Sequence, residues 1–236
     1  AGMGTDQAAA LSTSALNTLN ANQVAALTSS QLNAISSTKL QSINTTALGG
    51  LTTAQLSALS TTNVSGLLTT QVHSLSGAQL GSLGTAQLNA MNSLQVKAFS
   101  ATGLAGVSTT TLQGLKTEHV NILTTAEIVA LNTAQVNALT SSQVQALNTN
   151  ALQQLSSSQL RAMSTSQVAS LVANTQFNNL TSTQISALTT AQVQAVTTDQ
   201  VVALSSAYLS ALNTAQISAL TTDQVQALAA DKVNAL

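Results

Sequence analysis

Cysteine, proline and tryptophan are absent from this 236-residue chain, and aromatic and charged residues are scarce, at 1% and 5%. Without cysteine, the fold cannot depend on disulfides and thiol chemistry is excluded. The net charge of −1 provides no basic stripe for nucleic acid and no polybasic patch for a membrane surface. No apolar run approaches the roughly 18 residues that span a bilayer. We therefore expect no nucleic-acid partner and no membrane insertion.

What the sequence has instead is an eight-residue repeat. An aliphatic anchor recurs every eight residues from Met3 to Leu171, a nine-residue unit carries it to Leu180, and steps of eight continue to Leu236. The octad at 51–58 is typical, with an anchor, a hydroxyl or amide residue, two small residues, Gln, a second aliphatic residue, a polar residue and Ala. This period predicts a repeat architecture along the whole chain.

The period rules out both uninterrupted elements and favours a short capped helix. An α-helix advances about 100° per residue, so anchors eight apart would wander around it. A strand would place the two aliphatic residues on opposite faces. Thr52 and Gln55, in contrast, have the spacing of a capping box, and Leu51 and Leu56 have that of a hydrophobic staple. Of the 28 eight-residue units, 23 have Thr, Ser or Asn at the cap and 18 have Gln or Glu three residues later.

We therefore predict an all-α fold, an α-solenoid of very short capped helices with one helix per eight-residue repeat and both aliphatic positions facing inward. The runner-up is a β-solenoid, which the Thr and Val content favours. The acidic residues support the helical alternative, because each falls in the first turn of an expected helix, where the helix dipole favours negative charge. Glu127 is at the third helical position; those at the second are Asp6, Glu118, Asp199, Asp223 and Asp231.

No linker divides the chain, so we expect a single elongated repeat domain over residues 1–236. Its irregular nine-residue unit at 171–179 has Phe177 in place of the second aliphatic residue, and should form a local dislocation. Nine of the eleven glycines lie between 49 and 114, and this part should be more deformable. The start of the chain suggests a segment of a longer protein. Because neither end has a polar capping repeat, we expect both ends to continue into more chain or to abut another copy.

Residues that could carry chemistry are few and scattered. His73 and His119 lie far apart, and the Glu118 beside His119 faces another side of the helix, so no metal site is expected. Tyr208 replaces a Gln and should be a lone surface aromatic. The remaining departures from the repeat are core substitutions at Met3, Met91, Phe99 and Met163, cations late in their helices at Lys97 and Arg161, and bulky apolar residues at Leu68, Ile122, Val129 and Val202.

These four bulky residues either pack locally or form lateral contacts between solenoids. Nucleophile, base and acid cannot be assembled from two histidines, so we predict that the chain is not an enzyme, with no catalytic, cofactor-binding or metal-binding residues and no cofactor. Threonine rows would suit an ice-binding face. The cap position, however, accepts Ser and Asn as readily as Thr, which disfavours a flat Thr array.

Octads such as Leu188–Ala195 and Leu220–Ala227 read L-T-T-x-Q-V-x-A. They resemble the octapeptide repeat arrays of giant bacterial surface or secreted proteins, often labelled adhesin-like or haem-utilisation-like. The resemblance implies a spacer or fibre-forming role at the cell surface or outside the cell, and implies no haem site here. We therefore expect a structural protein that forms an extracellular filament or stalk by solenoid stacking, with itself as partner end to end; lateral contact between solenoids is the alternative left open above. The alternative is a surface module that binds a repetitive ligand, such as a glycan or ice.

Overall fold

The computed structural model describes residues 2–228 and 232. The expectations for the last octad, namely a lost cap at Ala229, a first-turn Asp231 and the anchor Leu236, lie outside these residues. Every regular element in the described part of the chain is helical and none is a strand. The predicted all-α solenoid of short helices is therefore confirmed, and the β-solenoid alternative is wrong.

The chain divides into two compact units, 1–130 and 131–236, which are described separately. A single domain over 1–236 stays a prediction. The helices of the first unit are α1 (Thr5–Ala10), α2 (Thr13–Asn17), α3 (Ala21–Ala25), α4 (Ser29–Ala34), α5 (Ser37–Leu40), α6 (Thr45–Leu48), α7 (Thr53–Ser57), α8 (Thr61–Ser65), α9 (Thr69–His73), α10 (Gly77–Gly81), α11 (Thr85–Ala90), α12 (Ser93–Val96), α13 (Ala101–Ala105), α14 (Thr109–Gln113), α15 (Thr117–Asn121) and α16 (Thr125–Val129).

The second unit continues the same pattern with one interruption. Its helices are α17 (Thr133–Ala138), α18 (Ser141–Ala146), α19 (Thr149–Gln153), α20 (Ser157–Ala162), α21 (Thr165–Ser170), the 3₁₀ helix η1 (Phe177–Asn179), α22 (Ser182–Ala187), α23 (Thr190–Ala195), α24 (Thr198–Ala203), α25 (Ser206–Leu209), α26 (Thr214–Ser218) and α27 (Thr222–Ala227).

Most of the described helices begin as the capping pattern predicts, although Ser205 at the start of α25 accepts no capping bond. In α7 the backbone amide of Gln55 donates to Thr52 Oγ1 at 3.1 Å, and the backbone amide of Thr52 donates to Gln55 Oε1 at 2.7 Å. Thr52 itself is extended, with φ −75° and ψ 158°, as is usual for an N-cap residue. Leu68 has no capping oxygen, yet its amide still donates to Gln71 Oε1 at 2.9 Å, so half of the capping box survives the lost cap.

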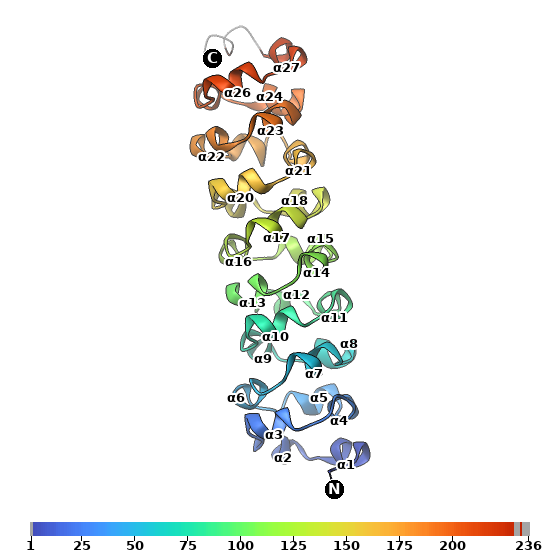
Figure 1. The fold of residues 1–236 in the computed structure, drawn as a ribbon. Coiled ribbons are helices and arrows are strands. Elements are labelled where there is room, and N and C mark those ends of the chain that lie inside the picture. The colour runs from blue at the N-terminus through green and yellow to red at the C-terminus, as the bar shows by residue number, and fades with distance from the viewer. Residues whose placement is uncertain (1, 229–231, 233–236) are drawn as a thin grey trace. The chain divides into compact units, whose positions relative to one another are not determined.

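Three octads make one turn of each solenoid. In the first unit α1 packs on α4, α4 on α7, α7 on α10 and α10 on α13, and the two other columns follow the same rule. The successive turns can be followed from blue to green in Figure 1. Both aliphatic positions of an octad face the axis. Leu83 and Leu88, for example, are each at most 1% exposed. Burial of this repeated apolar pair against neighbouring turns is what one octad alone cannot achieve.

Several glycines stand where turns approach most closely, a role that the sequence did not reveal. At the eighth position of its octad, Gly106 lies so close to the preceding turn that an added Cβ would be 2.1 Å from the carbonyl oxygen of Gly77. At the same octad position, a Cβ on Gly66 would lie 2.4 Å from that of Ser37. These glycines therefore permit backbone approach between turns, whatever they cost in helix propensity.

The nine-residue unit is the interruption in the second unit. No α-helix forms between α21 and α22. The 3₁₀ turn η1 takes its place, with Phe177 only 1% exposed. Gln176 preserves the cap one residue later than usual, because its Oε1 accepts from the Val172 amide at 3.0 Å. The extra residue is thus absorbed locally, and the repeat resumes at Thr181 with a complete capping box.

Candidate functional site

The most prominent polar feature is a line of buried amide side chains at the third helical position, which we call the glutamine seam. Gln87 shows its geometry. Its Oε1 accepts from the Gly84 amide at 2.8 Å, while its Nε2 donates to the carbonyls of Leu56 and Leu59 at 2.8 and 2.7 Å. One side chain therefore caps its own helix and bonds the preceding turn.

This bonding recurs at fixed register. The acceptors lie 28, 30 or 31 residues before the donor, and 29, 31 or 32 where the nine-residue unit intervenes. The seam includes Gln31, Gln55, Asn63, Gln71, Gln79, Gln87 and Gln95 in the first unit, and Gln135, Gln143, Gln159, Gln167, Gln176, Gln184, Gln192, Gln200, Gln216 and Gln224 in the second. All are at most 8% exposed.

The capping pattern alone did not identify this second role, although the composition carries a signal for it. A capping box accepts Glu or Gln, and the helix dipole favours Glu in a first turn. Yet 17 of the 18 octads with either residue have Gln. A carboxylate can replace the capping oxygen but not the Nε2 donor, and this difference explains the preference.

Cations at the third position donate in the same direction. Lys39 Nζ donates to the Ala9 carbonyl at 2.7 Å, and Lys232 Nζ bonds the carbonyl of Val202. His119 is also buried, 4% exposed. Burial chiefly lowers the pKa of His119, with a further lowering from Lys116, while Glu118 and the Met91 carbonyl oppose it. His119 therefore occupies the seam position of its octad.

Polar residues at the seventh position bond the following turn. Asn33 Nδ2 donates to the Ala58 carbonyl at 2.8 Å, and its Oδ1 accepts from the Ser60 amide at 2.8 Å. The exposed His73 takes the same place, with Nδ1 3.1 Å from the Ala98 carbonyl oxygen. Arg161 Nε donates to the Ala187 carbonyl at 2.9 Å. Asn33, His73 and Arg161 therefore each bond one turn to the next in the structure.

The other departures from the repeat divide between core and surface. Met91, Phe99 and Met163 are 3–4% exposed and fill the core, whereas Met3 is half-buried. Tyr208 and Ile122 are partly exposed, and Lys97 is exposed. Leu68, Val129 and Val202 remain 41–51% exposed, so local packing does not cover them. Glu118 lies 3.5 Å from Lys116 on the surface.

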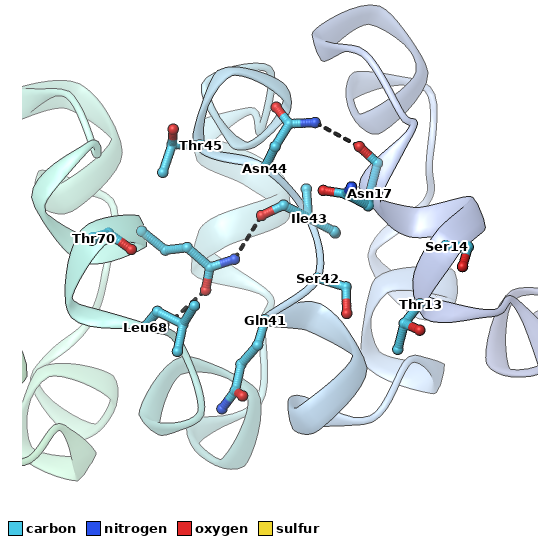
Figure 2. Close-up of a pocket in the computed structure, with 11 residues that line it drawn as sticks. Thr13, Ser14, Asn17, Gln41, Ser42, Ile43, Asn44, Thr45, Leu68 and Thr70 are labelled. Carbon is cyan, nitrogen blue, oxygen red and sulfur yellow. Dashed lines mark hydrogen bonds between the residues drawn. The ribbon is translucent and has the colours of Figure 1, made fainter.

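An open groove of about 450 Å³ crosses three turns of the first unit (Figure 2). Asn44 Nδ2 donates across it to the Asn17 carbonyl at 2.9 Å, and Gln71 Nε2 donates to the Ile43 carbonyl at 2.8 Å. Figure 2 shows Ser42, Thr45 and Thr70 around the same groove. Its eleven lining residues are amide, hydroxyl and aliphatic, without an aromatic or a charged side chain.

Among residues 2–228 and 232, no three His, Asp or Glu side chains gather where they could hold a metal ion. No helix in that part of the chain has the length and apolarity to cross a membrane.

The fold and the seam define a helical repeat protein in which three octads make a turn. The sequence comparisons agree with this class. The family described as the ALTTAQ repeat matches residues 120–149, 174–206 and 206–236, and the letters of that name stand unchanged at 187–192. No curated protein matches the chain. The expected repeat array is thereby supported on both fold and sequence.

Proposed function

We propose that the chain is a structural repeat protein that extends by stacking turn upon turn, as the subunit of an extracellular filament or stalk. The glutamine seam supports this role because all of its hydrogen bonds between turns run in the same direction along the solenoid. Each turn presents backbone carbonyls to the turn that follows and amide donors to the turn that precedes. Two such surfaces are complementary, and a head-to-tail contact of this kind can repeat without closing.

The observation that carries the proposal is this single direction of the seam, and the turn at residues 4–25 shows its donor side. Gln7 and Gln23 cap their helices, with Oε1 accepting from the Gly4 and Asn20 amides at 2.7 and 2.9 Å. Unlike the seam residues, both are exposed. The anchors Leu11 and Leu19 beside them are half-buried, whereas every anchor from Ile35 to Leu204 is buried. A further turn, from the same chain or from a second copy, would cover all of these groups.

The extracellular location rests on the resemblance to bacterial surface arrays, and the proposal assigns no catalytic role to the chain. The alternative, a module that binds a glycan or another repetitive ligand, has a weaker basis. The groove offers amides and hydroxyls, but no aromatic side chain on which a sugar ring could stack. Self-association is therefore the function that the geometry favours.

The test is association of the Gln7→Glu, Gln23→Glu double variant. Glutamate keeps the capping oxygen but removes the donor and places two carboxylates against carbonyl oxygens. We expect the parent chain to grow in mass with concentration by sedimentation and to form stacked fibres by electron microscopy. Near neutral pH, the variant should need a concentration about tenfold higher or more to associate to the same extent. This corresponds to a loss of roughly 1.4 kcal/mol in the free energy of association. It should recover below about pH 4.3, where glutamate takes up a proton.

The matched control is Gln145→Glu, Gln194→Glu, which adds the same charge at two exposed glutamines outside the seam, in turns that already have a following turn. This control should associate like the parent. A parent that stays strictly monomeric at high concentration would refute self-assembly. Equal loss of association in both double variants would attribute the effect to net charge and not to the seam.

A further inference from the structure

Glu127 is the single acidic residue at a seam position of the repeat. It is the third residue of α16 and only 1% exposed. Its Oε2 accepts from the Thr124 amide at 2.5 Å, and its own amide donates to Thr124 Oγ1 at 3.3 Å. The capping box is therefore complete, but Oε1 is buried without a hydrogen-bond partner.

The register of the seam indicates what Oε1 faces. One turn earlier in the same column, Gln95 donates to the carbonyls of Ser65 and Leu67, which lie 30 and 28 residues before it. The same separations from Glu127 lead to the carbonyls of Lys97 and Phe99, at the end of α12. Amide, ammonium and imidazole side chains at this position all supply an N–H to such carbonyls. An ionised carboxylate has no hydrogen to donate.

We propose that the folded chain holds Glu127 as a neutral carboxylic acid whose Oε1–H donates to these carbonyls, and that the joint between α12 and α16 weakens when this proton is lost to solvent. The glutamate then serves as a pH-dependent member of the seam. Acidification completes the bond that glutamine makes at every pH, and alkalinisation leaves a buried charge against carbonyl oxygens.

Among the described helices of the first unit, those around Glu127 offer it no compensating cation. Helix α13, which packs on α16, has no charged residue, and neither has α12. Lys97, which follows α12, is exposed and forms no ion pair with Glu127 within the described residues. On α15 and its cap, Lys116 and Glu118 pair with each other. Burial accordingly raises the pKa of Glu127, against smaller opposing contributions from its bonds to Thr124.

The sign of the pH effect follows from this raised pKa. A group that binds its proton more tightly in the folded chain contributes stability that is complete below its unfolded pKa. That contribution begins to fall near the ordinary value of 4.5 and is lost as the pH rises through the raised pKa of the folded state. His119 acts in the opposite sense. Because its pKa is lowered, its contribution is present above 6.5 and is lost on acidification.

The test follows the protonation of the carboxyl group by NMR and compares the stability of two variants as the pH changes. The chain has only two glutamates, so ¹³C labelling of Glu gives two carboxyl resonances, and Glu127→Gln assigns them by removing one. We expect the Glu127 carbon to keep the chemical shift of a carboxylic acid to higher pH than glutamate in an unstructured peptide. In urea unfolding, Glu127→Gln should gain stability over the parent progressively as the pH rises above about 4.5.

The effect of His119 is common to both chains and cancels in this difference. The matched control is Glu118→Gln, which makes the same change at an exposed residue of α15 and should retain the pH dependence of the parent. A Glu127 carbon that is ionised at the pH of an ordinary glutamate would overturn the proposal. So would a stability gain from Glu127→Gln that is equal at all pH values. The proposal would also be overturned if Glu127 were ionised and added Ca²⁺ restored the stability of the folded chain. The carbonyls would then form a cation site.

Discussion

Gln192→Leu is expected to destabilise the second unit by about 2–4 kcal/mol. Leucine keeps much of the volume but removes both polar ends of the side chain. The Thr189 amide would lose its bond to Oε1 at 2.8 Å, and the Met163 carbonyl its bond from Nε2 at 2.7 Å. Each buried polar group left without a partner costs about 1–3 kcal/mol. Urea unfolding measures the loss, and amide hydrogen exchange at Thr189 locates it.

The control is Gln194→Leu, the same substitution two residues further along α23. Gln194 is exposed, so the change should stay within about 0.5 kcal/mol. Similar losses in the two variants would mean that glutamine stabilises these helices through its propensity alone. The seam would then contribute nothing between turns.

Phe177→Ala should cost about 3–5 kcal/mol, the usual range for removing a fully buried aromatic side chain. Phe177 is 1% exposed and lies in η1, where the nine-residue unit has no α-helix to fill the core. It lines the same apolar interior as Ile185, Leu188 and Val193. Thermal or urea unfolding of the two chains measures the difference.

Phe177→Leu restores the aliphatic residue that other octads have at this place and should lose roughly half as much or less. Val202→Ala, at a side chain 51% exposed, should be close to neutral. If Phe177→Ala were no more damaging than Val202→Ala, the interruption would be loosely packed. Phe177 would then not compensate for the missing helix.

The octad predicted the local structure well because capping is a short-range interaction. Thr52 and Gln55 lie three residues apart, and their hydrogen bonds depend on nothing outside the octad. The inward direction of Leu51 and Leu56 follows from the same local geometry. The all-α class and the helix starts could therefore be derived before any contact between turns was known.

The arrangement between turns could not be derived in the same way, because it depends on how many octads complete a turn. Only with three octads per turn does Gln87 Nε2 meet the carbonyls of Leu56 and Leu59. The close approach at Gly106 depends on the same number. Glu127 seemed an ordinary first-turn acid for this reason. Its burial and unpartnered Oε1 become visible only when the preceding turn is in place.

Cysteine pairs in a chain that has no cysteine of its own test the winding most directly. A Cβ on Gly114 would lie 3.3 Å from that of Thr85, close to the 3.5–4.5 Å typical of disulfides. We expect Thr85→Cys, Gly114→Cys to oxidise readily to an intramolecular disulfide. Thr85→Cys combined with Ile122→Cys, one octad further along, should not. Bridging in that pair but not in the first would contradict three octads per turn, and with it the glutamine seam.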